Sequence, residues 1–363
     1  MINVFRRWID RYLSNEEALL LLVLIGVFLL VVGFMGNVLA PFLTAVVVAY
    51  LLQGSMQFLK RRGVGHLTAT VVVFIMFVGV MLTLLLFILP ASWAQLSQFF
   101  YELPRMASKG QALLMLLPEQ YPDLITTAQV QDWVQQAREE LASIGQWALS
   151  FSISGITLVM AMLIYCVLVP ILVFFLLKDA DAILSWCLGF LPRQRSLLNE
   201  VWVEMDLQIA NYIRGKAVEI VIVGGATYVA FLLLGLNYAA LLAIGVGLSV
   251  LVPYIGAAVI TVPIALVAYM QWGWSNDFFY LMAVYGIIQA LDGNVLVPLL
   301  FSEVVNLHPV AIIVAVLVFG GLWGFWGVFF AIPLATLLKA VIQSWPGHTG
   351  VAPEAGEENN ASG

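Results

Sequence analysis

Five long apolar runs, each long enough to cross a lipid bilayer as a helix, constrain this chain more than any other feature. They occupy residues 18–35, 38–58, 67–89, 153–177 and 217–236. An α-helix rises 1.5 Å per residue, so about 20 apolar residues cover the roughly 30 Å hydrocarbon layer. Charged residues make up only 10% of the chain, against roughly 25% in soluble domains. The sequence therefore predicts an all-α polytopic membrane protein.

The distribution of positive charge predicts how the chain is oriented. Three arginines lie within residues 1–15, three basic residues fill 60–62, and five lie within 178–216, whereas the longer segment 91–150 carries only three. Lys and Arg accumulate on the cytoplasmic side of a membrane protein. We therefore expect both termini in the cytoplasm and residues 91–150 in the periplasm of a bacterial inner-membrane protein.

The apolar runs and the polar segments between them divide the chain into six parts. These are three transmembrane helices in 1–90, a periplasmic amphipathic helical segment in 91–150, a fourth transmembrane helix in 151–178, a cytoplasmic amphipathic segment in 179–216, a C-terminal membrane half in 217–345 and a tail in 346–363. The tail has almost no large apolar residues and is expected to be disordered. With the Gly- and Pro-broken hairpins of the C-terminal half, about eight transmembrane helices are expected.

Both polar segments carry apolar residues at helical spacing. One stripe runs from Trp93 to Leu103 and should end before Pro104, a second covers residues 130–148, and a third runs from Leu198 to Tyr212. Such stripes indicate amphipathic helices. Two interpretations stay open: the helices pack on the bundle or lie in the membrane interface, or they dock a partner or gate a pathway.

The C-terminal half contains two similar units. Each has an apolar helix, an Asn, a hairpin broken by Gly, and then a Pro within an apolar run. Asn237 and Asn306 lie 69 positions apart, and Pro263 and Pro333 lie 70 apart. The expected topology starts the two units on opposite sides, because the second unit follows the polar link 271–277. We therefore expect inverted copies, an arrangement that recurs in transporters. The hairpin arms are short enough to be either full spans or re-entrant segments.

Several classes of function are excluded by missing motifs. The chain has three histidines but no His-Glu-x-x-His zinc motif, and it has no P-loop for ATP. The formal net charge is −6 and no long basic run exists, which argues against nucleic acid as a partner. Cys166 and Cys187 lie in dissimilar surroundings, so no disulfide is expected. We expect no enzyme, no cofactor and no metal site.

Polar residues near membrane depth are the candidates for function. A carboxylate there costs roughly 2.5–3.5 kcal/mol on insertion scales, so it tends to be paired, to face a cavity or to be functional. Asp292 could bind a cation or accept a proton, and Asn294 could offer an amide to a polar solute. The alternative is that residues 292–308 form an ordinary solvated loop.

Three further titratable residues have both a functional and a structural interpretation. Glu219 follows Lys216 just inside a span, where it could pair with that lysine, reach the surface or bind a coupling ion. Glu303 and His308 fit a solvated loop, although a histidine can titrate near physiological pH.

The order and spacing of several motifs resemble the autoinducer-2 exporter family, and within it the PerM-type permeases. The motifs are Pro253-Tyr254-Ile255-Gly256, Asp292-Gly293-Asn294 followed by Pro298, Leu307-His308-Pro309, Gly320-Gly321 and Ala331-Ile332-Pro333. The resemblance extends from about Arg11 to Trp345. It implies about eight spans and a homo-oligomer, with a pentamer as one candidate. It also implies export of autoinducer-2 or sodium/proton exchange.

The sequence and the resemblance together predict an inner-membrane transporter of a small solute, autoinducer-2 or a related polar molecule, that uses protons or sodium. Membrane lipid and the solute or ion are its expected partners. The alternative is a scaffold for cell-envelope proteins that acts through the periplasmic segment. The predicted coupling residues are Glu219, Asp292 and Glu303, and the predicted pathway residues are Pro253, Tyr254, Gly256, Asp292, Asn294, Pro298 and His308.

Overall fold

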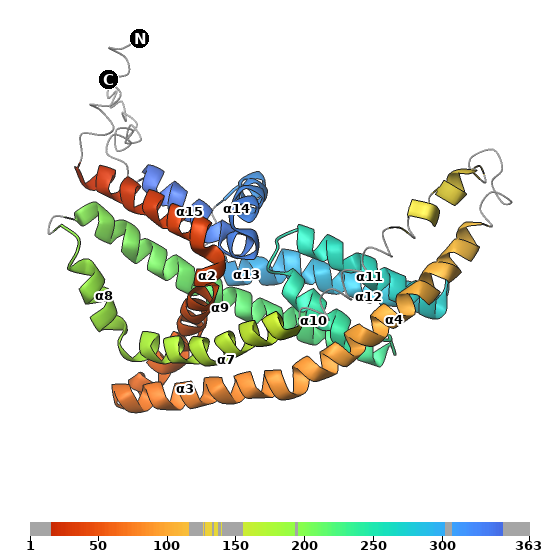
Figure 1. Cartoon of the computed structure of the whole chain (residues 1–363), viewed down its shortest axis with the longest axis horizontal. Helices are drawn as coiled ribbons and strands as arrows, with labels where there is room; N and C mark the ends of the chain where they lie inside the picture. Colours follow the sequence, from red (N-terminus) through yellow and green to blue (C-terminus); the bar gives the residue numbers. More distant parts are fainter. Residues whose placement is uncertain are drawn as a thin grey trace, which may run out of the picture. The chain divides into compact units, whose positions relative to one another are not determined.

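Helices are the regular elements of the part of the chain that the structure describes. The structure is a computed structural model that describes residues 16–115, 126, 128–132, 134–136, 139, 155–192, 195–301 and 307–343 (Figure 1). It divides into two compact units, which are taken in turn below. Unit 1 comprises 1–40, 180–214 and 301–363, and unit 2 comprises 41–179 and 215–300. The predicted all-α class is confirmed.

Seven segments of the described helices are long and apolar enough to cross a membrane. An eighth is a bent pair in which Met162–Lys178 and Ala180–Leu188 meet at 79°. The number of spans expected from the sequence is therefore confirmed, and the chain is a multi-pass membrane protein. The seven segments are Leu19–Gly36, Val38–Arg61, His66–Ala112, Leu198–Leu233, Ile255–Trp272, Asn276–Phe301 and Pro309–Phe329.

The first part of unit 2 is a packed helical group built from three elements. The second half of α2 (Glu16–Arg61) packs with α3 (His66–Thr83) and α7 (Gly155–Lys178) through small and branched side chains, among them Ala45, Ala69 and Val173. His66 donates from Nε2 to the carbonyl oxygen of Lys178 at 2.9 Å. The last carbonyl groups of a helix have no N–H donor within the helix, so this bond satisfies one of them at the end of α7.

Helix α3 continues without a break through the π-helical turn η1 (Leu84–Ile88) into α4 (Leu89–Leu114), which gives the long orange helix of Figure 1. The helix expected to end before Pro104 runs through it. Proline removes one backbone hydrogen bond and crowds the preceding turn. Pro104 is exposed, and water can satisfy the freed carbonyl at an exposed position, so the helix tolerates the residue.

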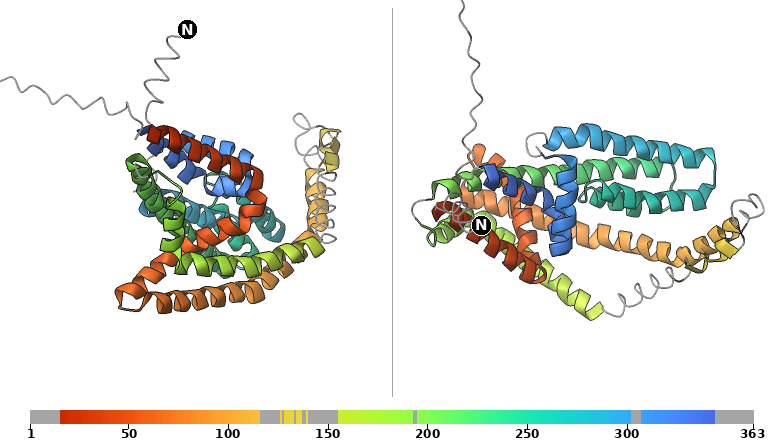
Figure 2. Two further views of the ribbon diagram at one scale, coloured as in Figure 1. Left: turned by 60° about the vertical axis from the view of Figure 1, so that its left-hand side comes forward. Right: turned by 90° about the horizontal axis from the view of Figure 1, so that it is seen from above.

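The second part of unit 2 is a bundle of the second half of α9 (Ser196–Leu233), α10 (Ala239–Ser249), α11 (Ile255–Trp272) and α12 (Asn276–Leu291). The π-helical turn η2 (Asp292–Leu296) and the short α13 (Val297–Phe301) continue α12. An apolar core that includes Phe231, Ile264 and Leu281 holds the bundle together. The teal helices α10 and α11 lie side by side in Figure 2.

The hairpin formed by α10 and α11 depends on a close approach of the backbone. Helix α10 has 11 residues, so it is only about 16 Å long and is too short to cross the hydrocarbon layer alone. Tyr254, the N-cap residue of α11, has a positive φ of 62°. A Cβ atom on Gly256 would overlap the carbonyl of Ser249, so only glycine fits where α11 turns back against the end of α10.

Unit 1 contains a second hairpin in which a glycine again packs closely against a backbone carbonyl. Its helices α14 (Pro309–Phe329) and α15 (Ala331–Gln343) are joined near a break at Gly324, whose φ is 57°. A Cβ atom on Gly327 would overlap the carbonyl of Phe319. Gly324 lies 70 positions after Tyr254, and Gly327 lies 71 after Gly256. The local backbone thus supports the internal repeat, while its inverted arrangement stays a prediction.

The rest of unit 1 packs around the first half of α9. Val201, Met205 and Tyr212 of the predicted amphipathic stripe are buried, and Leu21 of α2 and Val341 of α15 complete the core. The Tyr212 hydroxyl donates to the carbonyl oxygen of Phe329 at 2.9 Å. The short helix α8 (Ala180–Leu188) also belongs to this unit.

Candidate functional site

A buried ion pair lies in the second half of α9. Lys216 and Glu219 are 5% and 2% exposed, and Lys216 Nζ lies 2.8 Å from Glu219 Oε2. Among the residues whose burial the structure describes, these two are the charged side chains that are buried. Moving two charges out of water costs several kcal/mol per ion, which their mutual attraction repays only in favourable geometry. Such a pair within a membrane helix is a candidate functional feature.

The end of α10 supplies a second partner for the same ammonium group. Lys216 Nζ donates to the carbonyl oxygen of Val250 at 2.8 Å, and Val250 caps the C-terminus of α10. The last carbonyls of a helix lack intrahelical donors and carry partial negative charge. Because the hairpin turn at 250–255 stops α10 early, these carbonyls are presented inside the bundle. Lys216 thus bridges a carboxylate and a helix terminus.

Asp292 brings a second carboxylate to the cluster. It lies where α12 passes into η2, and it interacts electrostatically with both Lys216 and Glu219. Its Oδ1 atom is shielded from solvent and has no hydrogen-bond partner among the described residues. Two carboxylates and one ammonium group therefore share this part of the bundle, which we name the charge cluster: Lys216, Glu219 and Asp292.

Polar side chains extend from the charge cluster along one face of α12. Tyr285, Gln289 and Asp292 follow one another at spacings of four and three residues, which places them on the same helical face. The Tyr285 hydroxyl lies 3.1 Å from Thr261 Oγ1 and interacts with Gln289. Gln289 Nε2 is buried and has no hydrogen-bond partner in the described part of the chain.

A further buried polar atom lies on α9. Thr227 is fully buried, and its Oγ1 has no hydrogen-bond partner among the residues that the structure describes. It lies eight residues after Glu219, which is close to the same helical face. Buried polar groups without partners are few in folded proteins, and each calls for an explanation. A role in binding a proton, an ion or a solute hydroxyl would explain such a group.

The structure brings together some of the predicted residues. Glu219 and Asp292 belong to the charge cluster. Pro253, Tyr254 and Gly256 form the hairpin turn directly after Val250, so they determine where α10 ends rather than offering polar groups of their own. The Tyr254 side chain is exposed.

Other predicted residues have local partners instead. Asn294 is exposed and donates from Nδ2 to the carbonyl oxygen of Ala290 at 2.8 Å. Pro298 is exposed in α13. His308 belongs to unit 1, where it caps α14 by accepting from the backbone N–H of Val310 at 3.2 Å. Glu303 lies outside the described residues.

Sequence reasoning missed Tyr285, Gln289, Thr227 and Thr261. The spacing of Tyr285, Gln289 and Asp292 on an otherwise apolar helix was the available signal for the first two. Thr227 and Thr261 gave no such signal, because isolated threonines in membrane helices usually bond to their own backbone. In the described part of the chain, no group of three or more His, Cys, Asp or Glu side chains could hold a metal ion.

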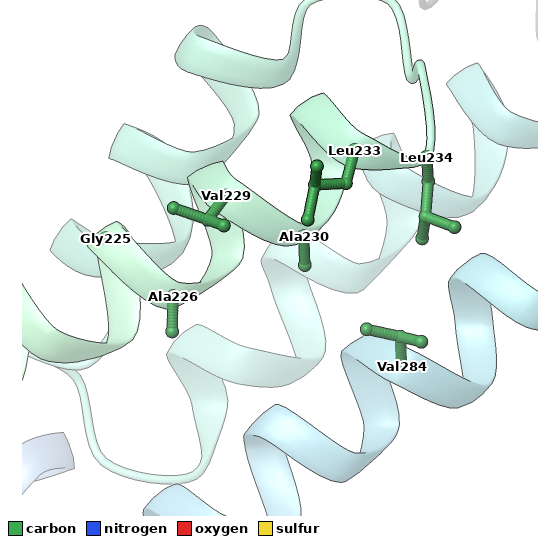
Figure 3. A pocket seen from close by; sticks show the side chains of 7 residues that line it. All are labelled: Gly225, Ala226, Val229, Ala230, Leu233, Leu234 and Val284. Atoms are coloured by element: carbon green, nitrogen blue, oxygen red, sulfur yellow. The ribbon is translucent and has the colours of Figure 1, made fainter.

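An apolar groove lies between α9 and α12, apart from the charge cluster (Figure 3). Its volume is about 600 Å³, and small or aliphatic side chains line it. A groove without polar groups cannot orient a polar solute. We therefore assign the candidate site to the charge cluster and not to this groove, whose lining residues are Gly225, Ala226, Val229, Ala230, Leu233, Leu234 and Val284.

Comparison with known proteins identifies the family. The family model for AI-2E family transporters matches residues 19–347. The chain is 46% identical over 346 residues to PerM, a presumed permease of Escherichia coli (strain K12), and the match covers 95% of this chain and 98% of PerM. It is 24% identical to the presumed transport protein YueF of Bacillus subtilis (strain 168), over 85% of this chain and 84% of YueF. The resemblance seen in the motifs is confirmed: this chain belongs to the AI-2E transporter family.

Proposed function

We propose that the protein is an inner-membrane transporter of a small polar solute in which the charge cluster couples transport to a cation. One observation carries the proposal: two carboxylates and one ammonium group lie inside the bundle against the end of a half-length helix. The family, and relatives described as a permease and as transport proteins, support it. We extend the proposal to cytoplasmic termini and a homo-oligomeric assembly.

The charge count of the cluster explains why it can couple. Lys216 neutralises one carboxylate, so the second carboxylate needs a proton, a sodium ion or solvent. A site that binds one additional cation and releases it elsewhere is what coupling to a proton or sodium gradient requires. In a low-dielectric interior, gaining or losing that charge changes the local interactions by several kcal/mol.

The same geometry links the cation to a movable element. Lys216 bonds to Glu219 and to Val250 at the tip of α10. A cation that competes for Glu219 or Asp292 alters how tightly Lys216 is held, and with it the tip of α10. In several transporter folds, discontinuous helices form the solute and ion sites, and one repeat moves against the other around them. The hairpin of α10 and α11 is therefore the proposed gate.

The solute would use the polar face of α12. Hydroxyl and amide groups from Tyr285, Gln289 and Thr261 suit a small molecule that carries several hydroxyl or carbonyl groups. Autoinducer-2, from which the family takes its name, is one candidate of that kind. No nucleotide motif exists in the sequence, so the driving force would be an ion gradient.

Flux through proteoliposomes tests the proposal. Asp292→Asn and Glu219→Gln should abolish solute flux driven by an imposed proton or sodium gradient, while the purified protein keeps its fold. Asp277→Asn on α12 and Glu200→Gln on α9 are matched controls, because both carboxylates are exposed, and they should retain flux. Wild-type flux in Asp292→Asn or Glu219→Gln would remove the charge cluster from the mechanism.

A deletion separates this proposal from the scaffold alternative. Removal of residues 96–146 should abolish a scaffolding phenotype while Asp292→Asn leaves that phenotype intact. If the protein is a transporter, Asp292→Asn should impair its function more than the deletion does.

A further inference from the structure

A small polar cavity lies at the end of the bundle to which α9 runs, apart from the charge cluster. It has a volume of about 160 Å³ and lies between α4, the turn from α9 to α10, and the last turns of α11. From α4 it is lined by Glu102, Arg105 and Lys109, and from the turn by Asn237 and Tyr238. Between Glu219 and the end of α9 at Leu233 the helix advances 14 residues, or about 21 Å. The cavity is therefore a separate site.

Specific contacts hold the walls of this cavity in place. Gln95 of α4 accepts a hydrogen bond on Oε1 from the backbone N–H of Leu241 at 3.0 Å, so it caps the first turn of α10. Phe99 packs edge-on against Tyr238, with ring centroids 5.6 Å apart. These contacts attach α4 to the beginning of α10. The cavity is thus formed by packed elements rather than by a chance approach of exposed side chains.

Gln271 lines the cavity and connects the end of α11 to the turn from α9 to α10. Its Oε1 accepts from the backbone N–H of Asn237 at 2.9 Å, and its Nε2 donates to the carbonyl oxygen of Gly235 at 2.8 Å. Both ends of the amide are engaged, so the turn from α9 to α10 is fixed against the end of α11. Such contacts around a site help to pre-organise the charged groups that line it.

The charges on the α4 wall leave two cations available. Arg105 and Lys109 lie four residues apart on one helical face, where like charges repel each other. Among the described residues, neither has an ion pair or a hydrogen bond. Glu102 interacts with the Tyr238 hydroxyl, and burial, together with this carboxylate, raises the pKa of Tyr238. The phenol therefore keeps its proton at neutral pH and can donate a hydrogen bond to Glu102.

The cavity lies on a part of the chain that water can reach. The continuous helical segment His66–Ala112 has 47 residues, or about 70 Å, more than twice the thickness of the hydrocarbon layer. The apolar stretch from 67 to 89 is long enough to fill that layer, and the charged residues of α4 follow it. A solute in water can therefore meet Arg105 and Lys109 directly.

We propose that this cavity binds a small oxyanion, a carboxylate or a phosphate, through Arg105 and Lys109. Guanidinium and ammonium groups are the usual protein ligands of both anions. The volume of about 160 Å³ is below that of a pocket for a drug-sized ligand, so the occupant is a small ion. The site goes beyond the proposed transport function and does not depend on coupling at the charge cluster.

Cysteine protection in the full-length chain tests the site. The sequence contains two cysteines, so Cys166→Ala and Cys187→Ser give a cysteine-free background. Met106→Cys places a thiol in the cavity wall, and Ser108→Cys, on the same helix but outside the cavity, serves as the control. Inorganic phosphate and succinate, each in a separate arm, are added to the purified protein before a maleimide. Sodium chloride at equal ionic strength controls for screening.

We expect phosphate, succinate or both to slow the labelling of Met106→Cys several-fold and to leave Ser108→Cys unchanged. Adding Arg105→Gln and Lys109→Gln should remove the protection. Adding Glu102→Gln should increase it, because a negative charge leaves the cavity. If Met106→Cys fails to fold, Asn237→Cys reports from the opposite wall.

Three results would overturn the proposal: protection by neither anion, equal protection by chloride, or protection that survives the loss of both cations. Each outcome is independent of solute flux. A failed flux experiment at Asp292 or Glu219 would therefore leave this site standing, and the reverse also holds.

Discussion

Replacing Lys216 with methionine should expose the energetic cost of the charge cluster. Met has nearly the same length as Lys but no charge, so the variant leaves Glu219 buried without its ammonium partner, which lies 2.8 Å away in the native protein. Breaking a buried pair in this way typically costs about 3–5 kcal/mol. We expect the free energy of unfolding of Lys216→Met to fall by that amount at pH 7.

The pH dependence of the loss gives the sharper test. An unpaired buried carboxylate loses its unfavourable charge at the lowest free-energy cost by binding a proton. From an ordinary glutamate pKa of about 4.3, protonation costs roughly 3.7 kcal/mol at pH 7 and about 1.36 kcal/mol less for each lower pH unit. The folded variant then binds more protons than its unfolded chain, so its stability rises as pH falls. Between pH 7 and pH 5 we expect about 2.7 kcal/mol to return.

Unfolding in mild detergent at pH 7 and pH 5 measures both effects, and two further variants control them. Lys178→Met breaks a partly exposed pair with Asp179 at 3.4 Å and should cost under about 1 kcal/mol. The double variant Lys216→Met/Glu219→Gln removes both charges and should regain the part of the loss that comes from the unpaired carboxylate, which leaves about 1–3 kcal/mol for the unpaired Val250 carbonyl. A Lys216→Met protein that is as stable as the wild type, or whose deficit is equal at both pH values, would refute the reasoning.

Three other predictions test separate parts of the structure. Gly256→Ala should destabilise the protein by about 1–3 kcal/mol, because its Cβ overlaps a carbonyl of the preceding helix. Gly286→Ala, with open space around its Cβ, should be neutral or slightly stabilising in the same thermal unfolding assay. Tyr285→Phe should reduce solute flux in proteoliposomes while changing the free energy of unfolding by only about 1 kcal/mol; unchanged flux would exclude its hydroxyl from the pathway. His308→Ala should cost about 1 kcal/mol of stability through loss of the α14 cap and leave flux intact, and a flux defect would contradict the capping role.

The membrane helices could be predicted from the sequence because the bilayer imposes one simple requirement on length and polarity. Each of the five long apolar runs coincides with a candidate span or with the bent pair. The hairpin turns were also visible, because Pro253, Gly256 and Pro333 interrupt apolar runs. Helix ends were harder to predict, as Pro104 shows: the pattern could not tell a solvated helix that tolerates proline from one that proline stops.

The candidate site could be predicted only in part. Sequence spacing shows which residues share a helical face, but it does not show which face of another helix they meet. The pairing of Glu219 with Lys216 could be foreseen, because three residues separate them on one helix. The approach of Asp292 and the carbonyl of Val250 could not be foreseen, because both depend on how α10 and α12 pack against α9. Asn294 was a plausible ligand until its bond to the backbone was visible.

The short length of α10 has a consequence for voltage. A helix that starts at one surface of the hydrocarbon layer and ends after about 16 Å places its tip near the middle of a layer about 30 Å thick. A full crossing is worth about 2.3 kcal/mol per elementary charge at 100 mV, so a cation that reaches the tip of α10 from one side crosses roughly half of the field. Binding at Lys216, Glu219 and Asp292 should therefore respond to membrane potential as well as to concentration.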